Sequence, residues 1–210
     1  MSDLETIRQE VVEVIRRVGP TLGKELDEHL PERNYLELWQ ACFTSPDILI
    51  SHFSRYYLRY DITREDFIRL SPSILRDFLS FTLFSTNDQR EQVIDRQVTL
   101  SNLHRQVSMQ KMRLARSILR QIMRKIPKEL HHEMCAFIAG DIAYFLAHRE
   151  PREVSAIGKM VNGSDIDIII VHDGLPDDIL ELIDREMMSF KLYYLRHPEY
   201  REEVDYICKH

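Results

Sequence analysis

Apolar residues recur every three or four positions through the first 130 residues, which is the spacing of one face of an α-helix. The first helix is predicted to begin at Ser2, because Ser2 and Glu5 form a capping-box pattern, and to end at Gly19-Pro20. Further helices are predicted over residues 21–30, 35–43 and 48–60, and from Thr63 and Ser71. Residues 1–127 are therefore expected to form an all-helical domain.

The stretch between Asn87 and Ile126 contains neither Gly nor Pro. Gly and Pro are the strongest helix breakers, so their absence predicts one long helix. The alternative is two helices with a break near Ser101-Asn102. Pro127 then marks the expected domain boundary.

The pattern changes after Pro127 to short apolar runs that alternate with amphipathic segments. Strands are predicted over residues 135–139, 166–171 and 203–208, helices over 141–148 and 177–189, and a loop over 150–160. Residues 128–210 are therefore expected to form a small mixed-sheet α/β domain. With the helical region before it, the chain is assigned to the α+β class.

The central strand of this region carries two carboxylates at its start. Asn162-Gly163 predicts a turn, and the run from Ile166 to Val171 is the most strand-prone in the chain. Side chains alternate along a strand, so Asp165 and Asp167 share a face while the isoleucines between and after them face a core. Two adjacent carboxylates repel each other unless a cation lies between them, and such oxygen ligands suit Mg²⁺ or Mn²⁺. The alternative is an ordinary hydrated strand end.

Composition places the chain among globular proteins without a membrane-spanning segment. It has 210 residues, 44% hydrophobic and 30% charged, and no apolar run approaches the roughly 18–20 residues of a membrane span. The N-terminus lacks the pattern of a secretory signal. Three widely spaced cysteines suggest free thiols, so a cytoplasmic location is expected.

The net charge of −6 is unevenly distributed. Residues 96–128 contain nine Lys and Arg residues and no acid, whereas residues 129–210 have a net charge of −9. The basic segment, residues 105–128, is a candidate surface for phosphates or nucleic acid. The alternative is that these side chains cover a helix face packed against the acidic region.

The order of strand, Gly turn, helix, Asp-x-Asp strand, helix and strand with a single Asp resembles the nucleotidyltransferases of the DNA polymerase beta superfamily. The residues that carry this resemblance are Ile138-Ala139-Gly140, Ser164-Asp165-Ile166-Asp167-Ile168 and Val204-Asp205-Tyr206. It covers residues 130–210. Two features depart from the family pattern: Asp141 follows Gly140, where the family has Gly or Ser, and the segment between Gly140 and Asp165 is long.

The resemblance implies two-metal transfer of a nucleoside monophosphate from a nucleoside triphosphate to an acceptor hydroxyl, with release of pyrophosphate. Asp165, Asp167 and Asp205 would hold Mg²⁺ or Mn²⁺, and Asp205 would also serve as general base. Gly140, Ser164 and Lys159 would bind the nucleotide. The acceptor would be a protein, a nucleic acid or a small molecule, selected by residues 1–127.

Two other hypotheses remain open at this stage. In one, Asp141 and the long segment have abolished catalysis, and the fold serves as a binding or regulatory module. In the other, the chain binds nucleic acid through the basic helix, residues 105–128, independently of Asp165 and Asp167.

Overall fold

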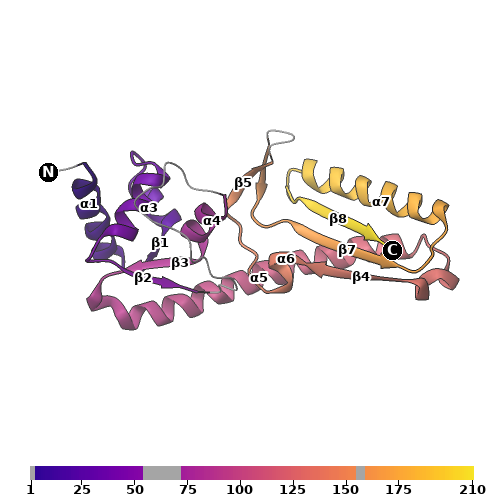
Figure 1. Cartoon of the computed structure of the whole chain (residues 1–210), viewed down its shortest axis with the longest axis horizontal. Helices are drawn as coiled ribbons and strands as arrows, with labels where there is room; N and C mark the ends of the chain where they lie inside the picture. The colour runs from indigo at the N-terminus through magenta and orange to yellow at the C-terminus, as the bar shows by residue number, and fades with distance from the viewer. Residues whose placement is uncertain (1–2, 54–71, 155–158) are drawn as a thin grey trace. The chain divides into compact units, whose positions relative to one another are not determined.

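The computed structural model describes residues 3–53, 72–154 and 159–210 of the chain (Figure 1). Residue contacts divide the chain into two compact units, Met1–Asn102 and Leu103–His210, called here the first and second unit. Both contain helices and strands, in agreement with the α+β class. Among the described residues, none of the helices has the length and apolar character needed to cross a membrane.

The first unit packs helices around a small antiparallel sheet. Its helices are α1 (Asp3–Val18), α2 (Gly23–His29), α3 (Tyr35–Thr44), α4 (Pro72–Ser80), the 3₁₀ turn η2 (Asn87–Gln89) and the start of α5 (Arg90–Met123). The sheet has the strand order β1 (Thr21–Leu22), β3 (Thr82–Ser85), β2 (Leu49–His52). The core joins the apolar face of α1 to α3 and α4 through Ile7, Val11, Ile15, Leu38, Trp39 and Phe78.

The prediction that residues 1–127 are all helical is wrong, because strands β1, β2 and β3 lie within this range. All four residues of β3 are buried, so its sequence shows no alternation that would separate it from a buried helix segment. Strand β2 begins where a helix over residues 48–60 was expected. The remainder of that helix and the one expected from Thr63 lie in residues 54–71, outside the described part of the chain.

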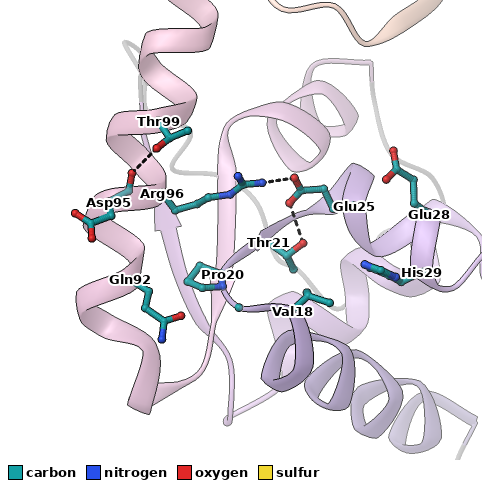
Figure 2. A pocket seen from close by; sticks show the side chains of 11 residues that line it. Val18, Pro20, Thr21, Glu25, Glu28, His29, Gln92, Asp95, Arg96 and Thr99 are labelled. Carbon is teal, nitrogen blue, oxygen red and sulfur yellow. Dashed lines mark hydrogen bonds and ion pairs between the residues drawn. The ribbon is translucent and has the colours of Figure 1, made fainter.

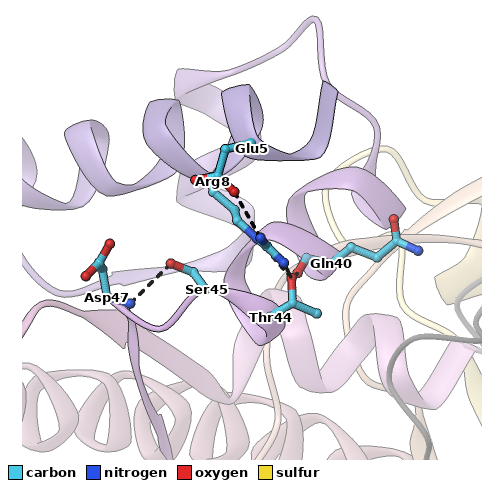
Figure 3. A network of polar contacts seen from close by, with 6 residues as sticks. All are labelled: Glu5, Arg8, Gln40, Thr44, Ser45 and Asp47. Atoms are coloured by element: carbon cyan, nitrogen blue, oxygen red, sulfur yellow. Dashed lines mark hydrogen bonds and ion pairs between the residues drawn. The ribbon is translucent and has the colours of Figure 1, made fainter. Parts of the chain in front are cut away.

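The segment before β2 shows why the expected helix does not begin there. Ser45 accepts a hydrogen bond from the backbone N–H of Asp47 at 3.3 Å and closes a turn rather than capping a helix (Figure 3). Nearby, the guanidinium group of Arg8 donates to Glu5 at 3.0 Å and to Thr44 at 2.7 Å. Arg8 therefore fixes α1 to the C-terminal end of α3.

Helix α5 is one continuous helix, which decides between the two alternatives for residues 87–126. The division between the units falls at Asn102, inside this helix, and differs from the boundary expected at Pro127. The reason is packing: apolar side chains from the second half of α5 belong to the core of the second unit. They are Val107, Ala115, Ile118 and Ile122.

The second unit contains a mixed sheet in the order β4 (Met134–Ala139), β7 (Ile166–His172), β8 (Val204–Lys209), as expected for this region (Figure 1). Strand β4 is antiparallel to β7, and β8 is parallel to β7. The connection between the parallel strands is α7 (Asp177–Arg196), since parallel neighbours require a crossover. The 3₁₀ helix η3 (Lys128–Glu133) precedes β4.

The connection between β4 and β7 differs from the prediction. The helix expected over residues 141–148 is a single turn, α6 (Gly140–Ala143). The loop expected over residues 150–160 contains a two-stranded hairpin, β5 (Pro151–Val154) and β6 (Lys159–Asn162). Each of these strands has only four residues, which is too short to show a clear alternation of apolar and polar positions, so the sequence pattern predicts a loop here.

The core of the second unit lies on one face of the mixed sheet. Ile166, Ile168 and Ile170 of β7 are at most 1% exposed. They pack with the apolar residues of α5 named above and with Ile179, Ile183 and Met187 of α7. Both helices therefore cover the same face, and the alternate residues of each strand point to the opposite face.

Candidate metal centre

Strand β7 places Asp165 and Asp167 on the face of the sheet opposite the core. Both side chains are half-buried, whereas Ile166 between them is completely buried. The predicted alternation of this strand is therefore confirmed. Asp165 is the residue immediately before the strand, and Asp167 is its second residue.

Strand β8 brings a third aspartate to the same face. Asp205 is the register partner of Asp167 on the neighbouring parallel strand. Neighbouring strands are about 4.8 Å apart, so the Cα atoms of the two residues are separated by about this distance. Ile166 and Val204, also partners, are both fully buried and confirm which face each strand turns inward. Asp205 thus lies beside Asp167, although 38 residues separate them in the chain.

Glu203 is a further member of the cluster that sequence reasoning missed. Carboxylate oxygens of Asp165, Glu203 and Asp205 all lie within 4.8 Å of one another. The backbone N–H of Ile166 donates to the carbonyl of Glu203 at 2.9 Å, which holds the two segments together. A signal for Glu203 does exist in the sequence, because it lies two residues before Asp205 and therefore shares its face in an extended segment.

The carboxylate of Asp167 lies against the backbone of Gly140. Gly140 has φ +65°, and a Cβ at this position would lie 2.1 Å from Oδ2 of Asp167. Any larger residue would collide with this carboxylate. Gly140 is therefore required for the position of Asp167, a reason different from the close phosphate approach that the resemblance implies.

Ser164, the residue before Asp165, forms a partly buried polar link with Asp141. The hydroxyl of Ser164 donates to Oδ2 of Asp141 at 2.8 Å and accepts from the backbone N–H of His148 at 3.3 Å. Ser164 is only 3% exposed. These bonds anchor the turn that presents Asp165, and they turn the carboxylate of Asp141 toward Ser164.

Gly163 packs this same turn closely against the preceding segment. It has φ +65°, and a Cβ there would lie 1.8 Å from the carbonyl oxygen of His148. Position 163 therefore requires glycine for two reasons: its positive φ and the lack of space for a side chain. The side chain of Lys159, the third expected nucleotide-binding residue, lies outside the described part of the chain.

Two lysines bring positive charge close to the carboxylates. Lys191 of α7 forms an ion pair with Oδ1 of Asp205. Lys111 of α5 forms one with Glu202, and both of these side chains are largely buried. Burial lowers the pKa of Lys111 and raises the pKa of Glu202, against the opposing effect of their mutual attraction.

The basic segment, residues 105–128, is partly used for contacts inside the second unit. Lys111 is buried as described, and Lys125 forms an ion pair with Glu186 of α7 at 2.6 Å. The guanidinium group of Arg105 lies 5.1 Å from the ring centre of Phe145. These contacts support the interpretation of the segment as a helix face packed against the acidic region.

The first unit has a polar pocket of about 620 Å³ between α2 and the first turns of α5 (Figure 2). Two of its charged residues pair with each other: Arg96 forms an ion pair with Glu25, which also accepts from the hydroxyl of Thr21 at 2.9 Å. Ligand pockets are usually lined by apolar side chains with few polar groups. This pocket has the opposite character, so the carboxylate cluster is the stronger functional candidate.

The donor set of the cluster is chemically suited to a hard divalent cation. It consists of carboxylate oxygens from Asp165, Glu203 and Asp205, with Asp167 adjacent. Mg²⁺ and Mn²⁺ prefer such oxygen ligands, whereas Zn²⁺ usually takes nitrogen and sulfur. Comparison of the chain with family models, curated proteins and solved structures found no match.

Proposed function

We propose that the second unit is a metal-dependent nucleotidyltransferase, which moves a nucleoside monophosphate from a nucleoside triphosphate to an acceptor hydroxyl. The observation that carries this proposal is the convergence of Asp165, Glu203 and Asp205, with Asp167 on the adjacent register position. The Ser-Asp-Ile-Asp pattern and its resemblance to the superfamily support the same function. The acceptor belongs to a protein, a nucleic acid or a small molecule.

The carboxylates would hold Mg²⁺ or Mn²⁺, and the ions would neutralise the phosphates and stabilise the attacking and leaving oxygens. Asp165, Asp167 and Asp205 are the proposed ligands from the resemblance, and Glu203 is added because its oxygen lies within 4.8 Å of those of Asp165 and Asp205. Four acids on one sheet face repel one another without such a charge, which favours cation uptake.

Asp205 is the proposed general base. It takes the proton of the acceptor hydroxyl, and the freed oxygen forms a bond to the α-phosphorus of the nucleotide. The bond from the α-phosphorus to the bridging oxygen breaks at the same centre. Pyrophosphate leaves with that electron pair, and the acceptor carries the nucleoside monophosphate.

Lys191 balances part of the negative charge of the carboxylate cluster. Its ammonium group pairs with Asp205 and offsets part of the repulsion within the cluster. With a metal ion bound, Oδ2 of Asp205 would serve as a ligand while Lys191 holds Oδ1, and the ammonium group would be available to a phosphate oxygen of the nucleotide.

The test is pyrophosphate release by the full chain with each α-labelled nucleoside triphosphate and Mg²⁺ or Mn²⁺, together with transfer of the label. Asp167→Asn and Asp205→Asn are expected to lower release by about 100-fold or more, because each removes a metal-binding charge. The matched control is Asp173→Asn, an exposed aspartate just after the same strand. It is expected to leave the rate unchanged.

The alternative is an inactive nucleotidyltransferase-fold protein that binds or regulates. The specific observations in its favour are the Lys191–Asp205 ion pair and Asp141, the acid after Gly140. This alternative predicts that Mn²⁺ and a nucleotide together raise the melting temperature without any pyrophosphate release. If neither release nor metal-dependent nucleotide binding is observed, both versions of the proposal are wrong.

A further inference from the structure

The sheet face that carries the carboxylates continues directly into an apolar row. Two neighbouring rows of register partners cross the three strands: Ala139, Asp167 and Asp205 form the first, and Phe137, Ile169 and Ile207 form the second. Phe137 and Ile207 are each 53% exposed. The second row, called here the apolar row, is therefore an accessible hydrophobic strip beside the candidate metal centre.

The spacing between the two rows is fixed by strand geometry. They are two residues apart along each strand, or about 7 Å. In a ligand whose phosphates are held at the first row, one sugar ring has about the length needed to reach the second row. A base attached to that sugar would therefore lie over the second row. The exposed side chains of Phe137 and Ile207 are therefore within reach of an apolar part of the same ligand.

We infer that the apolar row is the surface on which the base of the nucleotide stacks, an inference that rests on the proposed function. Phe137 supplies an aromatic face, and Ile169 and Ile207 extend the surface across β7 and β8. Stacking of a base on such side chains is favourable for every base, because each has a π-face.

The size and charge of this face favour a small ligand over a second copy of the chain. The row and the next row of register partners, Cys135, Val171 and Lys209, span three strands and about four residues, or roughly 200 Å². This is far below the ~800 Å² per partner of a stable interface. A metal-bound nucleotide would also bring cations to the carboxylates of the neighbouring row, which suits the negative charge of that row.

The chemistry of the row also predicts its selectivity. Phenylalanine and isoleucine side chains offer contact area but neither donate nor accept hydrogen bonds. The row alone therefore distinguishes bases by stacking area. Purine nucleotides are expected to bind more tightly than pyrimidine nucleotides, while ATP and GTP bind with similar affinity.

The experiment compares ATP with inorganic tripolyphosphate, which lacks the sugar and base, by calorimetric titration of the full chain with Mn²⁺ present. Phe137→Ser and Ile207→Ser are expected to weaken ATP binding about tenfold and to leave tripolyphosphate binding unchanged. Phe137→Tyr retains the ring and is expected to retain ATP affinity. Met188→Ser, at an exposed apolar position on α7 (44% exposed), is the matched control and should change neither affinity.

Two results would overturn the inference while leaving the metal centre intact. The first is equal affinity of the wild-type chain for ATP and tripolyphosphate; the second is ATP binding that neither row variant weakens. A dimer detected by sedimentation and dissociated by Phe137→Ser would assign the row to self-association, which also overturns it. Failure of both ligands to bind with Mn²⁺ would instead contradict the proposed function itself.

Discussion

At the scale of single residues, the lack of a side chain at Gly140 leaves the space that the carboxylate of Asp167 occupies. Gly140 and Gly174 both have positive φ, +65° and +76°, so both occupy a backbone region that L-residues rarely adopt. Of these two glycines, Gly140 alone has a neighbour within 4 Å of an added Cβ, and that neighbour is Oδ2 of Asp167. Gly174 therefore shows the effect of a positive φ alone, whereas Gly140 shows that effect together with the lack of space for a side chain.

Gly140→Ala is expected to destabilise the second unit more than Gly174→Ala. Both variants carry the backbone cost of about 1–2 kcal/mol, and the collision with Asp167 adds about 1–3 kcal/mol at Gly140 alone. Unfolding in urea measures the difference. Mn²⁺ affinity should fall only in Gly140→Ala, because Asp167 is displaced. Equal losses at the two positions would show that the contact with Asp167 has no energetic role.

At the scale of elements, α5 is joined to the segment before β8 by a buried ion pair. Lys111 is 3% exposed, and its ammonium group pairs with Glu202, the residue before Glu203 of the carboxylate cluster. A buried pair of this kind contributes little net stability, whereas removal of one partner leaves an uncompensated charge. The pair consequently fixes the position of the segment that supplies Glu203 and Asp205.

Lys111→Met is expected to lower the free energy of unfolding by about 3–5 kcal/mol, because Glu202 then remains buried without its charge partner. The double variant Lys111→Met/Glu202→Met should recover most of this loss. Unfolding in urea at pH 7 completes the double-mutant cycle. A double variant no more stable than Lys111→Met would show that the loss comes from packing at position 111 and not from the unpaired carboxylate.

The same pair predicts a pH dependence with a definite sign. Burial raises the pKa of Glu202 above its ordinary 4.5, so the folded chain binds this proton more tightly than the unfolded chain. This contribution to stability is fully present below pH 4.5 and is lost as the pH rises through the folded pKa. Compared with Glu202→Gln, the wild-type chain should therefore lose stability as the pH rises above 4.5, as measured by urea unfolding.

At the scale of the whole molecule, the second unit includes half of a helix that the sequence pattern assigns to the preceding domain. Val107, Ala115, Ile118 and Ile122 of α5 are at most 3% exposed and belong to the core around β7. A sheet with one apolar face needs a cover of this kind to exclude water. The folding unit is therefore expected to begin near Leu103 and not at residue 128.

A fragment of residues 103–210 is expected to unfold cooperatively, whereas a fragment of residues 128–210 is not. The shorter fragment lacks the apolar side chains of α5 and leaves Ile166, Ile168 and Ile170 partly uncovered. Thermal unfolding by circular dichroism distinguishes the two. Cooperative unfolding of residues 128–210 at the same temperature as the longer fragment would show that α5 is dispensable for this core.

The sequence alone determined the features that depend on local spacing. The alternation from Asp165 to Ile170 identified a strand with an acidic and an apolar face, and Gly19-Pro20 marked the end of α1. These signals are readable because one strand or helix turn fixes which side chains share a face. The position of Asp205 in the last strand was also predicted, although its register with Asp167 was not.

The resemblance implied that Asp205 joins Asp165 and Asp167, but only the tertiary structure decided the register and the other contacts between distant segments. It aligned Asp205 with Asp167, added Glu203 to the cluster and set Lys191 and Lys111 beside the acids. It also formed strands in the first unit, where the apolar pattern had predicted helix. The physical reason is that strand register and buried ion pairs depend on contacts between segments tens of residues apart, which leave no periodic trace in the sequence.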